Sequence, residues 1–147
     1  MNARLYDPAE IGTDPARAQL FTQLQADRFN KFLAELETPG YQPGQEPGIR
    51  STQKYLSPGM AVVWARSPYL HNGSVRTMQE PLASPATRAK TFRRGSRVYD
   101  AAQMGYVDDG AYLFDTGASG NSNAGHNYGT DLSIEQKREL IEHLKTI

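Results

Sequence analysis

Three histidines are the residues of this chain best suited to metal or proton chemistry. His71 and His126 lie in turns rich in glycine and asparagine, whereas His143 lies in a stretch with helical apolar spacing. Glycine lets a backbone approach a ligand closely, so a histidine beside it can face a metal or a flat cofactor. His126 directly follows Gly125 and is therefore the candidate metal-facing histidine. The alternative for His71 and His126 is structural, each ring fixing its own loop by hydrogen bonds.

Other common site chemistries fit the residue pattern poorly. A zinc site would lack a third histidine at matching spacing, and the chain contains no cysteine. Ser119 and Ser122 lack the G-x-S-x-G context of a hydrolase nucleophile, and their glycine-rich run has no G-K-[ST] phosphate signature. The acidic residues between Asp108 and Asp131 could supply oxygen ligands to calcium, although their spacing matches no EF-hand. Calcium therefore stays open as a second cofactor.

Composition narrows the classes of partner. Lys plus Arg and Asp plus Glu number 16 each, so the formal net charge is zero. This balance argues against nucleic acid as a partner, because no basic field would attract it. No apolar run has the length of a membrane span, and the first residues carry no hydrophobic signal segment. The absence of cysteine also excludes covalent haem attachment through a C-x-x-C-H motif in this chain.

Helical signals stand near both ends of the chain. The pair Asp14-Pro15 predicts a helix start, after which Leu and Phe recur at helical spacing up to residue 37. We expect this helix, residues 14–37, to bury its apolar face. Arg28 interrupts the stripe, which leaves either a bend or two shorter helices open. Ser133 and the glutamine three residues later form a capping-box sequence, which predicts a second helix near the C-terminus.

The segments between these helices look irregular. Residues 38–59 are rich in Pro, Gly and Gln, which predicts an extended connection. Residues 60–64 fit either a helical turn or a strand, a short helix is expected over 74–83, and glycines make 84–131 mostly loop. The predicted fold class is therefore mainly α with long irregular loops and little strand, under about one tenth of the residues. Long loops in a compact domain usually surround a cofactor, a metal or a partner.

Four ordered blocks of sequence resemble dihaem c-type cytochromes, the family of bacterial cytochrome c peroxidases and dihaem rubber oxygenases. The first block, WARSPYLHNGSV at residues 64–75, is similar to the W-A-T-A-P-Y-L-H-N-G-S-V-P stretch of that family. The others are KTFRRGSR at 90–97, GNSNAGH at 120–126 followed by YGT, and ELIEHLKT at 139–146, with a weaker echo, IGTDP, at 11–15. The resemblance implies one cytochrome c-like domain, or a fragment of one, over residues 1–147, with 60–147 as the family-like region.

The resemblance also implies haem as the cofactor and a role for some of the motif residues. It assigns the axial iron ligand to His126, which would be the metal site, because imidazole is a standard axial ligand. It places His71 near a haem edge or propionate, and Trp64 and Tyr69 against the macrocycle.

Three arginines of the family-like region are further candidates from the same resemblance. Arg66, Arg94 or Arg97 would pair with the haem propionates, since a guanidinium matches a carboxylate bidentately. Arg76 departs from the family pattern, because it stands where proline is usual.

The missing C-x-x-C-H motif shapes the functional hypothesis. We expect a haem-associated electron-transfer module that is not catalytic alone, whose haem is held by another segment or chain carrying C-x-x-C-H, and which meets a redox partner protein. The alternative is a haem-free structural or interaction module derived from the same family. The resemblance implies a periplasmic location; with no signal segment seen, a cytoplasmic one is the alternative.

Overall fold

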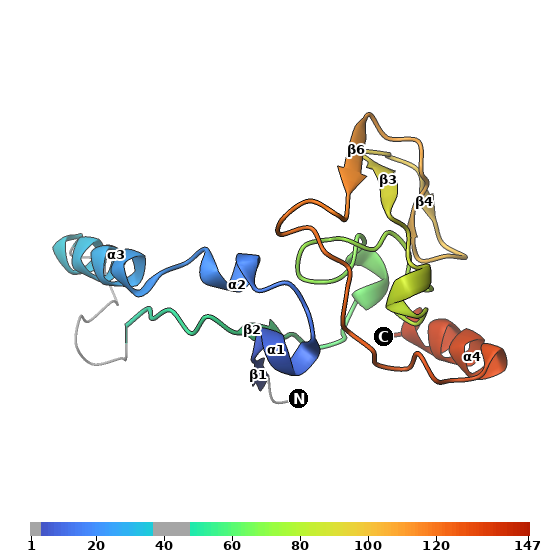
Figure 1. Ribbon diagram of the computed structural model, residues 1–147, viewed down its shortest axis with the longest axis horizontal. Coiled ribbons are helices and arrows are strands. Elements are labelled where there is room, and N and C mark those ends of the chain that lie inside the picture. Colours follow the sequence, from blue (N-terminus) through green and yellow to red (C-terminus); the bar gives the residue numbers. More distant parts are fainter. Residues whose placement is uncertain (1–3, 37–47) are drawn as a thin grey trace.

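The structure, a computed structural model, describes residues 4–36 and 48–147 and consists of two parts. We call residues 4–36 and 48–57 the N-terminal arm, and residues 60–147 the body. Figure 1 shows the arm extending to one side of the body, with its longest helix at the outer end.

The arm is built from three helices and one pair of short strands. Its elements are β1 (Arg4–Tyr6), α1 (Pro8–Ile11), α2 (Ala16–Gln19), α3 (Gln23–Glu35) and β2 (Tyr55–Ser57). The two strands pair antiparallel, with Arg4 opposite Ser57. The connection predicted over 38–59 lies outside the described residues from 38 to 47, and its described part ends in β2.

The segment predicted as a helix over 14–37 forms two shorter helices, as one alternative allowed, but the break lies at residues 20–22 and not at Arg28. Thr22 is the N-cap of α3. Its hydroxyl accepts the Gln25 N–H at 3.3 Å, and its own N–H donates to the Gln25 side chain at 2.7 Å. This reciprocal pair satisfies two N–H groups that a helix start leaves free, so α3 begins there. Asp14 still helps to start α2, because its carboxylate accepts the Ala16 N–H at 2.8 Å.

The expected burial of this apolar face is wrong. Within α3 only Ala26 is buried. The large apolar side chains of α3 and its flanks are exposed to between 41% and 69%: Leu20, Phe21, Leu24, Phe29, Phe32 and Leu36. The spacing of apolar residues correctly predicts a helix here, but the described chain leaves most of the resulting face exposed.

The body contains four short strands, two 3₁₀ helices and the C-terminal helix. These are η1 (Val63–Ala65), η2 (Pro85–Thr87), β3 (Thr91–Arg94), β4 (Tyr99–Asp100), β5 (Gly105–Tyr106), β6 (Tyr112–Asp115) and α4 (Ile134–Leu144). Strand β3 pairs antiparallel with β6, and β4 with β5. The core forms under α4: Val63, Tyr69, Val75, Met78, Leu82, Met104, Ile141 and Leu144. Among the residues described, no helix is long and apolar enough to cross a membrane.

The mainly α fold class is wrong, as is the expectation of less than one tenth strand. The structure has 29% helix and 15% strand, with the remainder in turns and loops. The glycines of 84–131 separate short strands: Phe92 and Phe114 face each other across β3 and β6, with ring centroids 5.2 Å apart. Residues 74–83 form turns where a helix was expected, whereas α4 begins at the predicted Ser133 cap.

Candidate functional site

The fold brings His71 and His126 together where the arm meets the body. Their ring centroids lie 5.6 Å apart with an interplanar angle of 27°. Tyr55, from β2 of the arm, lies tilted against the His71 ring, with ring centroids 4.2 Å apart and an interplanar angle of 32°. Its hydroxyl donates to the Asp14 carbonyl at 2.7 Å, which holds the tyrosine in place. Three aromatic rings from three distant segments therefore form one cluster, the histidine cluster.

His126 is positioned by a close approach between its loop and the end of α1. Its N–H donates to the Ile11 carbonyl at 3.1 Å, and its φ of 52° lies in the left-handed region. The preceding Gly125 has a φ of 69°, and a Cβ there would lie 2.5 Å from the carbonyl oxygens of Ile11 and Gly12. Only glycine fits this contact without moving one backbone from the other.

Arg88 fixes the backbone of the His126 loop by hydrogen bonds to its carbonyl groups. Its side chain donates to the carbonyls of Asn123, Gly125 and His126 on that loop, and it is only 2% exposed. It also donates to carbonyls of the 80–83 turn. Because one guanidinium binds both segments, the loop that carries His126 is fixed to the body.

The His71 turn is tied to the same loop by its neighbours. Asn72 donates from its amide to the carbonyls of Gly120 and Ser122 at 3.1 and 2.8 Å. Ser74, which is fully buried, donates to the Ser122 carbonyl at 3.2 Å. The P-Y-L-H-N-G-S block and the G-N-S-N-A-G-H block, whose histidines are 55 positions apart, thus form one structural unit.

Three imidazole nitrogens of the pair are buried without a hydrogen-bond partner. They are Nδ1 and Nε2 of His71 and Nε2 of His126. Burial, with the nearby His71 and Arg88, lowers the pKa of His126 to about 4. Burial also lowers the pKa of His71, with Asp14 opposing the shift and Arg17 adding to it. Both rings are therefore neutral near pH 7 and keep a lone pair for a ligand.

This donor set suits a metal centre that takes neutral imidazole. A buried polar atom without a partner costs free energy, so each of these nitrogens requires a partner, which can be an ordered water, an ion or a metal. Haem iron accepts such a nitrogen as an axial ligand. The alternative, in which each ring hydrogen-bonds its own loop, fails for these three nitrogens, because none of them has a hydrogen-bond partner.

The other predicted site residues lie apart from this cluster. Tyr69 is a core residue, 7% exposed, whose hydroxyl donates to the Met104 carbonyl at 2.7 Å. Trp64 lies in η1 and is 42% exposed. Arg97 is exposed just before β4. No hydrogen bond or ring contact within the described chain joins any of these three to the histidine cluster.

Two further arginines have structural partners. Arg66 donates to the Gly59 carbonyl at 2.8 Å. Arg94 lies 3.6 Å from the centre of the Phe114 ring and donates to the carbonyls of Asn72 and Gly73. Arg94 is thus used to join β3 to the His71 turn.

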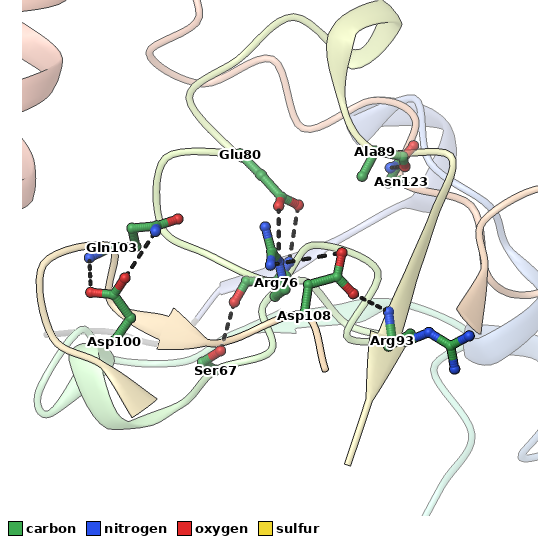
Figure 2. A network of polar contacts seen from close by, with 9 residues as sticks. All are labelled: Ser67, Arg76, Glu80, Ala89, Arg93, Asp100, Gln103, Asp108 and Asn123. Carbon is green, nitrogen blue, oxygen red and sulfur yellow. Dashed lines mark hydrogen bonds and ion pairs between the residues drawn. The ribbon is translucent and has the colours of Figure 1, made fainter. Parts of the chain in front are cut away.

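Arg76, where the family pattern has proline, is the centre of a polar network. Its backbone N–H donates to Glu80 at 3.0 Å, and its guanidinium forms longer ion pairs with Glu80 and Asp108, at 3.8 and 3.9 Å. Figure 2 shows Arg76 between the two carboxylates, with Ser67 donating to its carbonyl. The Arg93 N–H also donates to Asp108, which links the turn to β3. Proline could supply neither the N–H nor the charge.

The calcium prediction finds no support. Within residues 4–36 and 48–147, no group of three His, Cys, Asp or Glu side chains could hold a metal ion. Asp108 accepts from Arg93 and Asp115 accepts from Gly117, so each carboxylate has its own local partner.

Sequence reasoning missed Tyr55, Arg88 and Arg17 as parts of the site. The IGTDP echo at 11–15 carried a usable signal, because it resembles the family and lies against the His126 loop. Nothing in the sequence marks Arg88 as buried, since arginine is mostly exposed in proteins.

Comparison with known proteins agrees with the sequence blocks. Residues 54–93 match the family model for RoxA-like, cytochrome c-like proteins. Two proteins of Sinorhizobium fredii (strain NBRC 101917 / NGR234) are similar: uncharacterized protein y4iJ, 33% identical over 93% of this chain, and uncharacterized protein y4iM, 33% identical over 99%. The chain spans 30% and 44% of their lengths. No solved structure matches. The family-model match supports a cytochrome c-like family, which suggests haem as the cofactor.

Proposed function

We propose that this chain is a haem-associated electron-transfer module in which Nε2 of His126 is an axial ligand to haem iron. The observation that carries the proposal is the buried, unpartnered Nε2 of a neutral imidazole. The haem is attached covalently on another segment or chain, as in a c-type dihaem protein, and the site works in the periplasm with a redox partner.

The residues around His126 have defined tasks in this proposal. When bound, the haem supplies a one-electron couple at its iron. Arg88 donates to the carbonyl of His126 and thereby fixes the position of the imidazole ring relative to the body. His71 and Tyr55 cover the ring from the arm side and keep water from it. A ligand held by its loop and partly shielded from solvent would tune the redox potential of the iron, since burial and solvent access around a metal set that potential.

Titration of the purified chain with a haem peptide that carries its own C-x-x-C-H histidine tests the ligand assignment, because that histidine supplies the second axial ligand. We expect a Soret shift and a low-spin electron paramagnetic resonance signal, both lost in His126→Asn. Asparagine adopts positive φ more readily than other residues, so this change preserves the backbone at φ 52°. His143→Asn, on the exposed side of α4, is the matched control and keeps the signal.

Two results would contradict the assignment. If His71→Asn abolishes the low-spin signal and His126→Asn does not, the ligand is His71. If the unsubstituted chain gives no low-spin species with this haem peptide, the haem proposal fails.

A second function, contact with a partner polypeptide, is favoured by the exposed apolar face of α3. We propose that this face packs on the haem-bearing segment or chain, because the relatives contain more sequence than this chain spans. Leu24 and Phe32 are 59% and 53% exposed, which is costly for large apolar groups in water.

Calorimetric titration with the part of y4iJ outside the aligned region tests this contact. We expect binding that Leu24→Glu with Phe32→Glu weakens at least about tenfold, about 1.4 kcal/mol. Asp27→Ala with Arg28→Ala, polar changes on the same helix, leaves it intact. Equal binding by the two double variants would eliminate α3 as the contact.

A further inference from the structure

A shallow groove of about 280 Å³ lies beside the histidine cluster. Arg17 and Phe21, at α2 and just beyond it, line one side, and the 50–55 segment with Arg50, Lys54 and Tyr55 lines the other. His71 closes the end toward the body. The groove is therefore assembled by the arm, and its end is an unpartnered imidazole.

The groove concentrates positive charge in a chain whose formal net charge is zero. Three cationic residues line it, Arg17, Arg50 and Lys54, and its lining contains no acidic side chain. Lys54 forms an ion pair with Asp7 at 3.0 Å. Arg17 and Arg50 form no ion pair with any residue that the structure describes. Two guanidinium groups thus remain available for an anion.

The aromatic lining points to the shape of the ligand. Phe21 and Tyr55 provide flat apolar surface in the lining of the groove, and the Tyr55 ring lies against the His71 ring. Arg17 also lies close enough to His71 to lower its pKa further. A flat apolar molecule with carboxylates on one edge would satisfy the rings and the guanidinium groups together.

We infer that Arg17 and Arg50 bind the carboxylates on one edge of a tetrapyrrole whose ring reaches toward His71. The inference rests on the proposed haem function and assigns propionate binding to the arm instead of to Arg97. The volume of the groove is slightly below the usual range for ligand pockets. The groove therefore receives the carboxylate edge of the tetrapyrrole and not the whole ring.

Metal-free protoporphyrin IX is the probe, because its binding needs the carboxylates and no iron ligand. We expect fluorescence titration to show binding that Arg17→Gln with Arg50→Gln weakens at least about tenfold. The control Arg28→Gln with Arg97→Gln removes two exposed arginines elsewhere and leaves the affinity unchanged. The dimethyl ester of the porphyrin binds the unsubstituted chain and the Arg17/Arg50 variant equally weakly.

Three outcomes would overturn the inference. They are no binding of protoporphyrin IX, equal affinity for the acid and its ester, and equal weakening by the two double variants. Succinate binding that depends on Arg17 and Arg50, without porphyrin binding, would also reject the tetrapyrrole assignment. Loss of the low-spin haem signal in His126→Asn is a separate result, since it tests the iron ligand and not the carboxylate groove.

Discussion

Helices α3 and α4 begin with the same signal and end in different surroundings. Thr22 with Gln25, and Ser133 with Gln136, form the two reciprocal capping boxes. Helix α4 buries Ile141 and Leu144 in the core, whereas α3 leaves its apolar face in solvent. Capping and spacing are local, so they determine where a helix starts; burial depends on what another segment supplies opposite it.

The two parts of the chain accordingly depend on different interactions. The body has a contiguous apolar core, while the arm reaches the body through hydrogen bonds at Asp14 and Ile11 and through the Tyr55 ring, which lies against His71. We therefore expect changes in the body to alter global stability and changes in the arm to act locally.

Arg88→Ala should have the largest effect of the changes considered. It removes a buried cation that donates to six carbonyls, several of which would lose their partner. We expect the free energy of unfolding to fall by more than about 3 kcal/mol, enough to unfold a marginal domain. Urea unfolding followed by Trp64 fluorescence measures it. Arg28→Ala, on exposed α3, should change little, and similar losses in both variants would abolish the contrast between body and arm.

Leu144→Ala and Leu24→Ala compare the two helices directly. Leu144 is 6% exposed and Leu24 59%. Removing the first leaves a core cavity, so we expect a loss of about 2–4 kcal/mol, against about 0.5 kcal/mol or less for the second. Thermal and urea melts of the two variants provide the comparison. A loss of several kcal/mol for Leu24→Ala would mean that the α3 face is covered in solution, by a second copy for example.

Acidification should weaken the junction between arm and body. The folded pKa of His126 is about 4 and the unfolded value about 6.5, so the unfolded state takes up the proton first as pH falls. Stability is fully present above pH 6.5 and declines toward pH 4, by about 2 kcal/mol after allowance for partial exposure. His71, shifted in the same direction, adds to the loss.

The contribution of His126 to the pH dependence of stability is measured by comparing the unsubstituted chain with His126→Asn across this pH range. Urea midpoints of the unsubstituted chain and of His126→Asn should converge as the pH falls from 6.5 to 4, because the variant lacks this titration. His143→Asn is the control at an exposed position. Profiles that stay parallel would show that His126 is not buried as a neutral ring.

The sequence predicts the local elements better than their assembly. The Ser133 cap is predicted from the glutamine three residues later, and the His126 ligand hypothesis from the glycine before it. Both depend only on neighbouring residues, which the sequence shows directly. The pairing of β3 with β6 could not be predicted, because strands of four residues between glycines carry weak periodicity. The meeting of His71 with Tyr55 depends on how the arm folds back, a contact that no local pattern encodes.

The smallest expected effect comes from the two helix caps, and it sharpens the comparison most directly. Ser133→Ala and Thr22→Ala remove the same kind of hydrogen bond, each worth about 1 kcal/mol to its helix. In α4 that loss should appear in global unfolding, since Ile141 and Leu144 couple the helix to the core. In α3 it should appear only as faster amide exchange within the helix, with an unchanged urea midpoint. If Thr22→Ala lowers the midpoint as much as Ser133→Ala, α3 unfolds together with the body, and the arm is as cooperative as the core despite its exposed face.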